Sequence, residues 1–111
     1  ATLSEYGIDV KVIVLHNDTL GMIVQLQDFF YNHHYSQCTL NKRKNLPMLA
    51  ESLGVKGYAI EKQNDLIPVL KEAFAHKGPA LVDIRISPEE RVYPTVPGGK
   101  ALSDMILGGD A

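Results

Sequence analysis

The chain is poor in cysteine, in long apolar runs and in excess charge of one sign. Its single cysteine, Cys38, cannot form an intramolecular disulfide or a thiolate zinc cage, so the sequence predicts a reducing, cytoplasmic setting. The 11 Lys plus Arg are outnumbered by 13 Asp plus Glu and are scattered apart from residues 42–44, which argues against a nucleic-acid partner. The longest unbroken apolar run, residues 12–15, is too short to cross a bilayer, and the N-terminus lacks a signal-peptide pattern. We therefore expect a soluble chain with no membrane partner.

The apolar residues, 45% of the 111, recur in an order typical of a parallel α/β domain. Residues 10–15 are β-branched and almost continuously apolar, which predicts a strand covered on both faces in the middle of a sheet. Further strands are expected at residues 57–60 and 82–86, the last with a wetter face because Asp83 and Arg85 alternate with apolar residues. The predicted fold is a parallel sheet with flanking helices.

Three helices are expected around these strands. One spans residues 21–32, one runs from a cap at Asn45 to Gly54, and one starts after a cap at Asn64 and closes at residues 77–79. Helical spacing of apolar residues predicts the face that each helix buries. In chain order these faces are Met22, Leu26, Phe29 and Phe30; Leu46, Leu49 and Leu53; and Leu66, Ile67, Leu70 and Phe74.

The two ends of the chain differ from its middle. Residues 2–7 have the pattern of a last helical turn, with Gly7 as its left-handed C-cap, and a helix without a beginning predicts that a longer protein precedes Ala1. After Ser87 the chain is rich in proline and glycine, which indicates an irregular tail that covers another part of the protein. One helical turn, capped by Ser103, is expected in it.

The most informative segment is the polar turn that follows the first predicted strand. His16, Asn17, Asp18 and Thr19 lie at the carboxyl end of that strand, and Gly21 then opens a helix. A helix N-terminus after a strand is an anion site, since its amide groups and dipole attract negative charge. The Asn17 side-chain oxygen and the Thr19 carbonyl are hard ligands suited to Mg²⁺ beside phosphate. The alternative is that Asn17 and Asp18 only shape the turn and cap the helix.

Several blocks of this sequence closely resemble the C-terminal diphosphate-binding domain of the acetolactate synthase (acetohydroxyacid synthase) catalytic subunit. The resemblance runs from end to end. The motif most specific to this family is the Gly-Met-x-x-Gln block followed by an aromatic pair. The blocks are Val12-Ile13-Val14-Leu15-His16-Asn17, Leu20-Gly21-Met22-Ile23-Val24-Gln25, Phe29-Phe30-Tyr31, Lys77-Gly78-Pro79, Val92-Tyr93-Pro94 and Pro97-Gly98-Gly99.

The resemblance implies a set of cofactor-binding residues. In this family Mg²⁺ is held by the side chain at the position of Asn17 and the carbonyl at that of Thr19, and thiamine diphosphate lies against the positions of Leu20, Gly21 and Met22. Met22 would act in catalysis by holding the two cofactor rings in a bent V, for which an uncharged, bulky thioether is suited. Residues 1–86 would form the C-terminal part of the cofactor-binding domain, and residues 87–111 a tail over the active site.

The resemblance also implies a substrate channel. Ile23, Leu26, Phe30 and Gly98 match positions that line or close it, and Leu26 stands where most biosynthetic members carry tryptophan. We therefore expect a weaker preference for 2-ketobutyrate over pyruvate as acceptor, and tolerance to inhibitors that stack on tryptophan. Members of the family are homodimers or tetramers, usually bind FAD on another domain and often recruit a small regulatory subunit.

Two functional elements of the family, one metal-binding and one catalytic, are missing from these residues. The Gly-Asp-Gly triplet that supplies a further Mg²⁺ ligand is expected just before Ala1, and the activating glutamate belongs to a partner subunit. The 111 residues alone are therefore expected to be inactive. Two other hypotheses remain: a sister thiamine diphosphate enzyme such as glyoxylate carboligase, and a non-catalytic α/β interaction module.

The remaining chemical side chains give weaker signals. His16, His33 and His34 are interpreted as solvated histidines rather than a metal cluster. Cys38 has no activating neighbour in the sequence and is interpreted as a bystander thiol. Residues 42–44 are expected to form a solvated loop.

Overall fold

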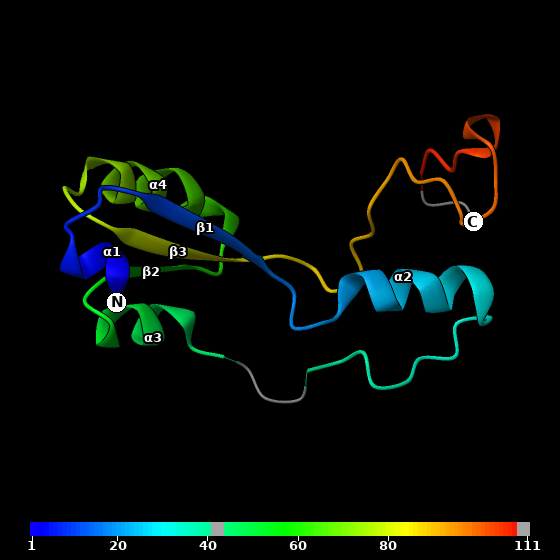
Figure 1. Cartoon of the computed structure of the whole chain (residues 1–111), viewed down its shortest axis with the longest axis horizontal. Helices are drawn as coiled ribbons and strands as arrows, with labels where there is room; N and C mark the ends of the chain where they lie inside the picture. Colours follow the sequence, from blue (N-terminus) through cyan, green and yellow to red (C-terminus); the bar gives the residue numbers. More distant parts are fainter. Residues whose placement is uncertain (41–43, 109–111) are drawn as a thin grey trace. The chain divides into compact units, whose positions relative to one another are not determined.

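The computed structural model of the chain describes residues 1–40 and 44–108, which form two compact units (Figure 1). Unit 1 contains residues 1–17 and 44–86, and unit 2 contains residues 18–40 and 87–108. Each unit is described by itself. The division into a cofactor domain at 1–86 and a tail at 87–111 concerns the family's domain plan and stays a prediction.

Unit 1 is built on a three-stranded parallel sheet, which confirms the predicted α/β class. Its strands are β1 (Lys11–His16), β2 (Lys56–Ile60) and β3 (Ala80–Arg85), in the order β1-β3-β2. Lys11 of β1 and Lys56 of β2 both pair with Ala80, so all three strands run in register. The last strand along the chain is therefore the central one.

The position of β1 differs from the prediction. The sequence placed it in the middle of a sheet, covered on both faces, whereas in the described chain it is an edge strand with β3 as its neighbour. Val12, Ile13 and Leu15 stay exposed, Leu15 by 65%. The apolar run therefore exceeds what the described elements cover.

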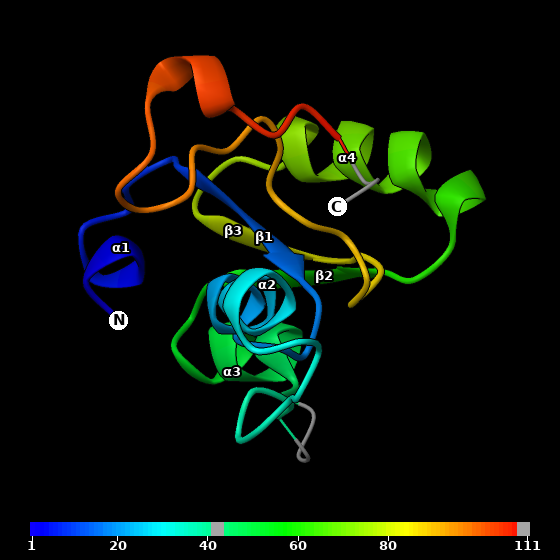
Figure 2. The same ribbon diagram turned by 90° about the vertical axis from the view of Figure 1, so that its right-hand side faces the viewer.

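Helix α4 (Leu66–Ala75) covers one face of the sheet (Figure 2). The core on this side joins Ala73 of the helix to Ile60 of β2 and Val82 of β3, and both Ala73 and Val82 are fully buried. The predicted inner face of α4 is correct for two of its four residues. Leu66 and Leu70 contact the core, but Ile67 and Phe74 are exposed while Val69 and Ala73 pack inward. Asn64 does not cap this helix, because it lies inside the 3-10 turn η1 (Gln63–Asp65).

Helix α3 (Leu46–Ser52) covers the opposite face. The Asn45 side chain accepts a hydrogen bond from the Met48 amide at 2.9 Å, which confirms the predicted cap. Leu49 and Leu53, expected on the inner face, are exposed, and Ala50 is buried instead. The backbone of Pro47 lies so close to β2 that a Cβ at Gly57 would be 2.5 Å from the Pro47 carbonyl oxygen. Small residues therefore set the contact between α3 and the sheet.

The predicted N-terminal helical turn is present. Helix α1 (Thr2–Glu5) ends at a Tyr6 C-cap, and Gly7 follows with a φ of 59°. That φ lies in the left-handed region that favours glycine, as the sequence predicted.

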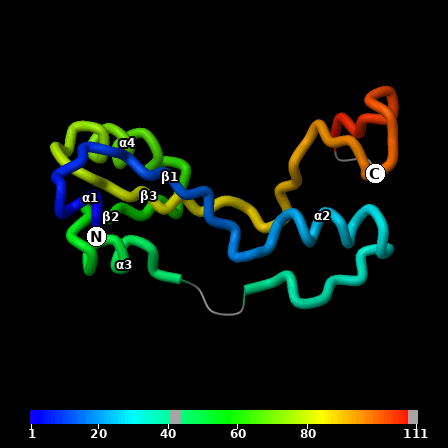
Figure 3. The backbone as a smooth tube through the Cα atoms, in the orientation of Figure 1, coloured from blue at the N-terminus to red at the C-terminus, as the bar shows by residue number. Residues whose placement is uncertain are grey.

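Unit 2 consists of helix α2 (Gly21–Phe30), the loop after it and the tail (Figure 3). Helix α2 ends two residues earlier than predicted, because Asn32 and His33 have positive φ. The tail is irregular apart from the 3-10 turn η2 (Leu102–Asp104), where Ser103 lies inside the turn and the Asp104 carboxylate accepts from the Ala101 amide. The predicted solvated loop at Lys42 and Arg43 lies outside the described residues, as do residues 109–111.

Candidate functional site

The turn before α2 has an uncommon backbone conformation. Asp18 has a left-handed φ of 54°, uncommon for a residue with a side chain. The amides of Ile23 and Val24 both donate to the Leu20 carbonyl, at 2.9 and 3.0 Å, and start the helix. The amides of Gly21 and Met22 precede these bonds and face the open end of the helix. No side chain caps this first turn, whereas the left-handed conformation of Asp18 shapes the turn before it.

Thr19 pairs with Thr39 in a short antiparallel bridge. The two hydrogen bonds of the bridge run from the Leu20 amide to the Cys38 carbonyl and from the Leu40 amide to the Asp18 carbonyl, both at 2.8 Å. In this arrangement the carbonyl of the central residue points away from the opposite strand. The Thr19 carbonyl is therefore oriented away from residues 38–40.

The predicted cofactor and channel residues of α2 share one side of the helix. Met22, Leu26 and Phe30 follow each other at intervals of four residues, and Ile23 lies beside them. All four are exposed, Met22 by 61% and Leu26 by 46%. Within the described residues Met22 is not a core residue. The buried positions of this helix are instead Val24 and Gln25.

Two predicted site residues lie outside this helix in the sequence. Asn17 follows β1 as the last residue of unit 1, whereas the segment from Thr19 to Phe30 belongs to unit 2. Gly98 lies in the tail, and a Cβ built on it would meet no described atom within 4 Å. Met22, Ile23, Leu26 and Phe30 are thus exposed together on α2, and the cofactor and channel roles of all these residues, Asn17 and Gly98 included, stay predictions.

Gln25 has a role that sequence reasoning missed. It is 3% exposed, and its side-chain amide forms two hydrogen bonds with the backbone of Val92. Its Nε2 donates to the Val92 carbonyl at 3.1 Å, and its Oε1 accepts from the Val92 amide at 2.8 Å. A buried glutamine needs such partners, so a polar residue in an apolar helix was the available signal. Gln25 holds the tail against α2.

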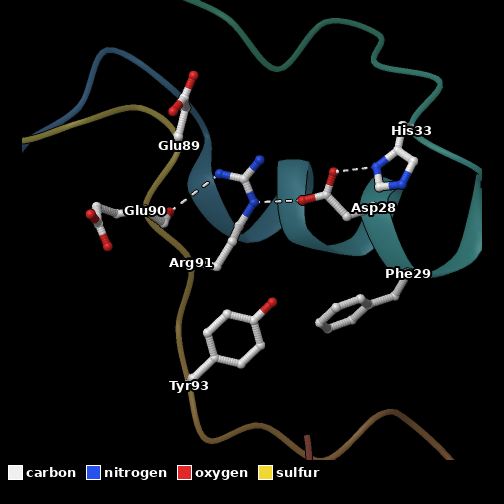
Figure 4. Close-up of a pocket in the computed structure, with 7 residues that line it drawn as sticks. All are labelled: Asp28, Phe29, His33, Glu89, Glu90, Arg91 and Tyr93. Carbon is white, nitrogen blue, oxygen red and sulfur yellow. Dashed lines mark hydrogen bonds and ion pairs between the residues drawn. The ribbon is translucent and has the colours of Figure 1, made fainter. Parts of the chain in front are cut away.

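Asp28, also missed, accepts hydrogen bonds from three side chains, two of which, Arg91 and His33, are drawn in Figure 4. Its carboxylate accepts from Arg91 Nε at 2.5 Å, from the Tyr35 hydroxyl at 2.5 Å and from His33 Nδ1 at 3.1 Å. Burial raises the pKa of Asp28, but these hydrogen bonds outweigh it and lower that pKa to about 2. The bond to Asp28 in turn raises the pKa of Tyr35. Asp28, His33 and Arg91 line a hollow of about 430 Å³ with Phe29, Glu89, Glu90 and Tyr93.

The acidity of Asp28 makes the attachment of the tail dependent on pH. Because its folded pKa of about 2 lies below the ordinary 3.8, the stability that the Asp28 carboxylate contributes to this attachment is fully present above pH 3.8 and is lost as pH falls through about 2. We expect hydrogen exchange at the Val92 amide, corrected for its intrinsic pH dependence, to accelerate over this window. Exchange measured by mass spectrometry checks this. In the Asp28→Asn variant the corrected rate should stay flat, and a persisting pH dependence there would contradict the assignment to Asp28.

The histidines are placed differently from one another. His16 was interpreted as solvated, which is wrong: its side chain is 11% exposed, and Nδ1 lies 3.0 and 3.2 Å from the two carboxylate oxygens of Asp83. Asp83 was expected on a wetter face, but α3 covers this side of the central strand and leaves the residue 4% exposed. His33 and His34 are exposed, as predicted.

The remaining features concern Cys38, metal ligation and membrane spans. Cys38 is a free, buried thiol. In residues 1–40 and 44–108, no group of three or more His, Cys, Asp and Glu residues is arranged to hold a metal ion. Among the described helices, none has the length and apolar character needed to cross a membrane.

Comparison with known proteins connects this site to a cofactor. Residues 1–84 match the family described as thiamine pyrophosphate enzyme, C-terminal TPP binding domain. The mitochondrial acetolactate synthase of Schizosaccharomyces pombe is 42% identical over 107 residues, which cover 96% of this chain and 16% of that protein. The mitochondrial acetolactate synthase catalytic subunit of Saccharomyces cerevisiae is 38% identical over 100 residues, covering 90% of this chain and 14% of that protein.

A bacterial relative gives the same result. The acetolactate synthase isozyme 1 large subunit of Escherichia coli is 36% identical over 106 residues, covering 96% of this chain and 19% of that protein. The chain therefore spans less than a fifth of the length of these three relatives. The family match includes β1, the turn after it and α2, and it extends over more than half of the chain. This chain belongs to the C-terminal TPP-binding domain family of thiamine pyrophosphate enzymes.

Proposed function

We propose that this chain is part of an acetolactate synthase that condenses pyruvate with a second 2-keto acid, either pyruvate or 2-ketobutyrate, to an acetohydroxy acid. The observation that carries the proposal is the identity of 36% to 42% with acetolactate synthases over nearly the whole chain. The open face of α2, where Met22, Leu26 and Phe30 are exposed together, supports it because a reacting substrate needs an apolar wall.

The residues present fit thiamine diphosphate with Mg²⁺. The amides of Gly21 and Met22 at the start of α2 would bind the diphosphate, favoured by the helix dipole. The Thr19 carbonyl, which points away from residues 38–40, and the Asn17 side chain would hold Mg²⁺ through oxygen. Leu20 and the exposed thioether of Met22 would support the rings of the cofactor. When bound, thiamine diphosphate supplies the carbon nucleophile and the electron sink for loss of CO₂.

The proposal includes properties of the whole protein. These are FAD bound mainly by another domain, assembly into a homodimer or tetramer, a small regulatory subunit and a place in branched-chain amino acid biosynthesis. They rest on the resemblance to the family. A cytoplasmic location stays a prediction, beside the mitochondrial location that the names of two fungal relatives give for those proteins.

The test uses the natural polypeptide that contains these residues. Its intact mass and the residues that precede Ala1 should be determined, and the purified protein assayed for acetolactate with pyruvate, thiamine diphosphate and Mg²⁺. We expect acetolactate from pyruvate alone. Product from glyoxylate but not from pyruvate would replace the proposal by a sister carboligase. No thiamine diphosphate binding at all would favour an interaction module.

Leu26 provides a test of the substrate channel. In the Leu26→Trp variant we expect the ratio of acetohydroxybutyrate to acetolactate, with both keto acids present, to rise about tenfold, since one apolar wall contributes roughly 1–3 kcal/mol of discrimination. Sensitivity to inhibitors that stack on tryptophan should rise with it. Leu53→Trp, at an exposed leucine of unit 1, is the control. An unchanged product ratio in Leu26→Trp would remove Leu26 from the channel.

A further inference from the structure

Three polar side chains of α2 form hydrogen bonds with two other segments of unit 2, the following loop and the tail. Asp28 binds Arg91 of the tail and Tyr35 of the following loop, and Gln25 binds the Val92 backbone. Gln27 adds two bonds to Ser36, from its Nε2 to the carbonyl at 3.1 Å and from the Ser36 amide to its Oε1 at 3.2 Å. We call the contacts of Gln25 and Asp28 with Arg91 and Val92 the tail latch.

The Asp28–Arg91 part of the tail latch lies away from the open face of the helix. At about 100° per residue, Asp28 is displaced by roughly 200° from Leu26, so its side chain leaves from the far side. Figure 4 shows Asp28 and Arg91 pointing toward each other from the helix and the tail. The side chains of the pair are 13% and 17% exposed, so water screens their charges only in part. Asp28 therefore contacts Arg91 on the side of α2 opposite Leu26.

We propose that Asp28 and Arg91 are positioning residues for the acceptor keto acid: by fixing the tail behind α2, they fix the half of its open face that carries Leu26 and Phe30. This inference rests on the proposed function. The N-terminal half of the helix is held independently, because Leu20 bonds to Cys38 and to the first turn. Loss of the latch should thus displace Leu26 and Phe30 more than Gly21 and Met22.

The experiment compares Asp28→Asn, Arg91→Gln and the double variant in the natural full-length polypeptide. Hydrogen exchange reports attachment of the tail at residues 88–93, titration calorimetry with thiamine diphosphate and Mg²⁺ reports cofactor affinity, and steady-state kinetics report KM for the acceptor. Glu90→Gln is the matched control, since its carboxylate lies outside the latch although it neighbours Arg91.

We expect each single variant to raise exchange at residues 88–93 and KM for the acceptor about tenfold, since a hydrogen bond between two charges is among the stronger ones. The dissociation constant of thiamine diphosphate should change less than twofold, and the double variant should resemble either single one because both remove the same contact. Parallel weakening of cofactor and acceptor would indicate general destabilisation and overturn the inference, as would unchanged exchange or KM. A wild-type protein that does not condense pyruvate would overturn the proposed function first, and the acceptor role with it, even if exchange responds.

Discussion

Replacing Gly57 by alanine is expected to destabilise unit 1 by about 1–3 kcal/mol, because the added methyl group has no space. Its Cβ would lie 2.5 Å from the carbonyl oxygen and 2.8 Å from the Cα of Pro47. Both are backbone atoms in the first turn of α3, so relief requires the helix to move off the sheet rather than a side chain to rotate. Denaturant unfolding of the 111-residue chain, followed by circular dichroism, measures the change.

Gly98→Ala is the matched control for Gly57→Ala. It makes the same chemical change at a glycine where a Cβ would meet nothing within 4 Å. Its unfolding midpoint should equal that of the wild type within error. If Gly57→Ala were as stable as this control, α3 would not pack against β2 as closely as described.

Replacing Asn17 by alanine is expected to weaken binding of Mg²⁺ with thiamine diphosphate at least tenfold. Loss of a residue that only supports a metal ligand already weakens metal binding by roughly 10- to 100-fold. The change removes one oxygen from the proposed site and leaves the Thr19 carbonyl in place. Titration calorimetry on the natural polypeptide, with Mg²⁺ varied at fixed cofactor, measures it. The loss should be smaller for Mn²⁺, which accepts a wider range of ligand geometry.

Two further variants make the Asn17 result specific. Asn17→Asp retains an oxygen at the same position and should bind Mg²⁺ better than Asn17→Ala does. Asn64→Ala removes an exposed amide in η1 and should leave binding unchanged. Equal Mg²⁺ affinity in Asn17→Ala and the wild type would show that Asn17 only shapes the turn, which was the alternative interpretation of the sequence.

The order of elements could be predicted from sequence because each depends on local signals. The Asn45 cap, the left-handed Gly7 and the β-branched strand at β1 act over a few residues, and all are observed. The inner faces of the helices were less predictable. Ala50 and Ala73 are buried where leucine or phenylalanine was expected, since close backbone packing favours small residues at the contact.

The candidate site, too, could be predicted from the sequence only in part. Met22 and Leu26 were identified through a motif, and their shared face follows from helical spacing. Gln25 and Asp28 carry the tail latch, yet their partners come from residues 91 and 92, far along the sequence. Which polar residues of a helix become buried depends on where a distant segment lies. Periodicity within the helix contains no information on this.

The strand order of unit 1 has a consequence for how the protein is made. On the ribosome β1 and β2 emerge before β3, yet each pairs with β3 and not with the other. Until residues 80–85 leave the exit tunnel, β1 and β2 lack the strand that both pair with among the described residues, and the closure of a long chain segment must precede pairing. A nascent chain halted before β3 would therefore lack the strand that joins β1 to β2, and exposed strand edges of this kind are prone to aggregation.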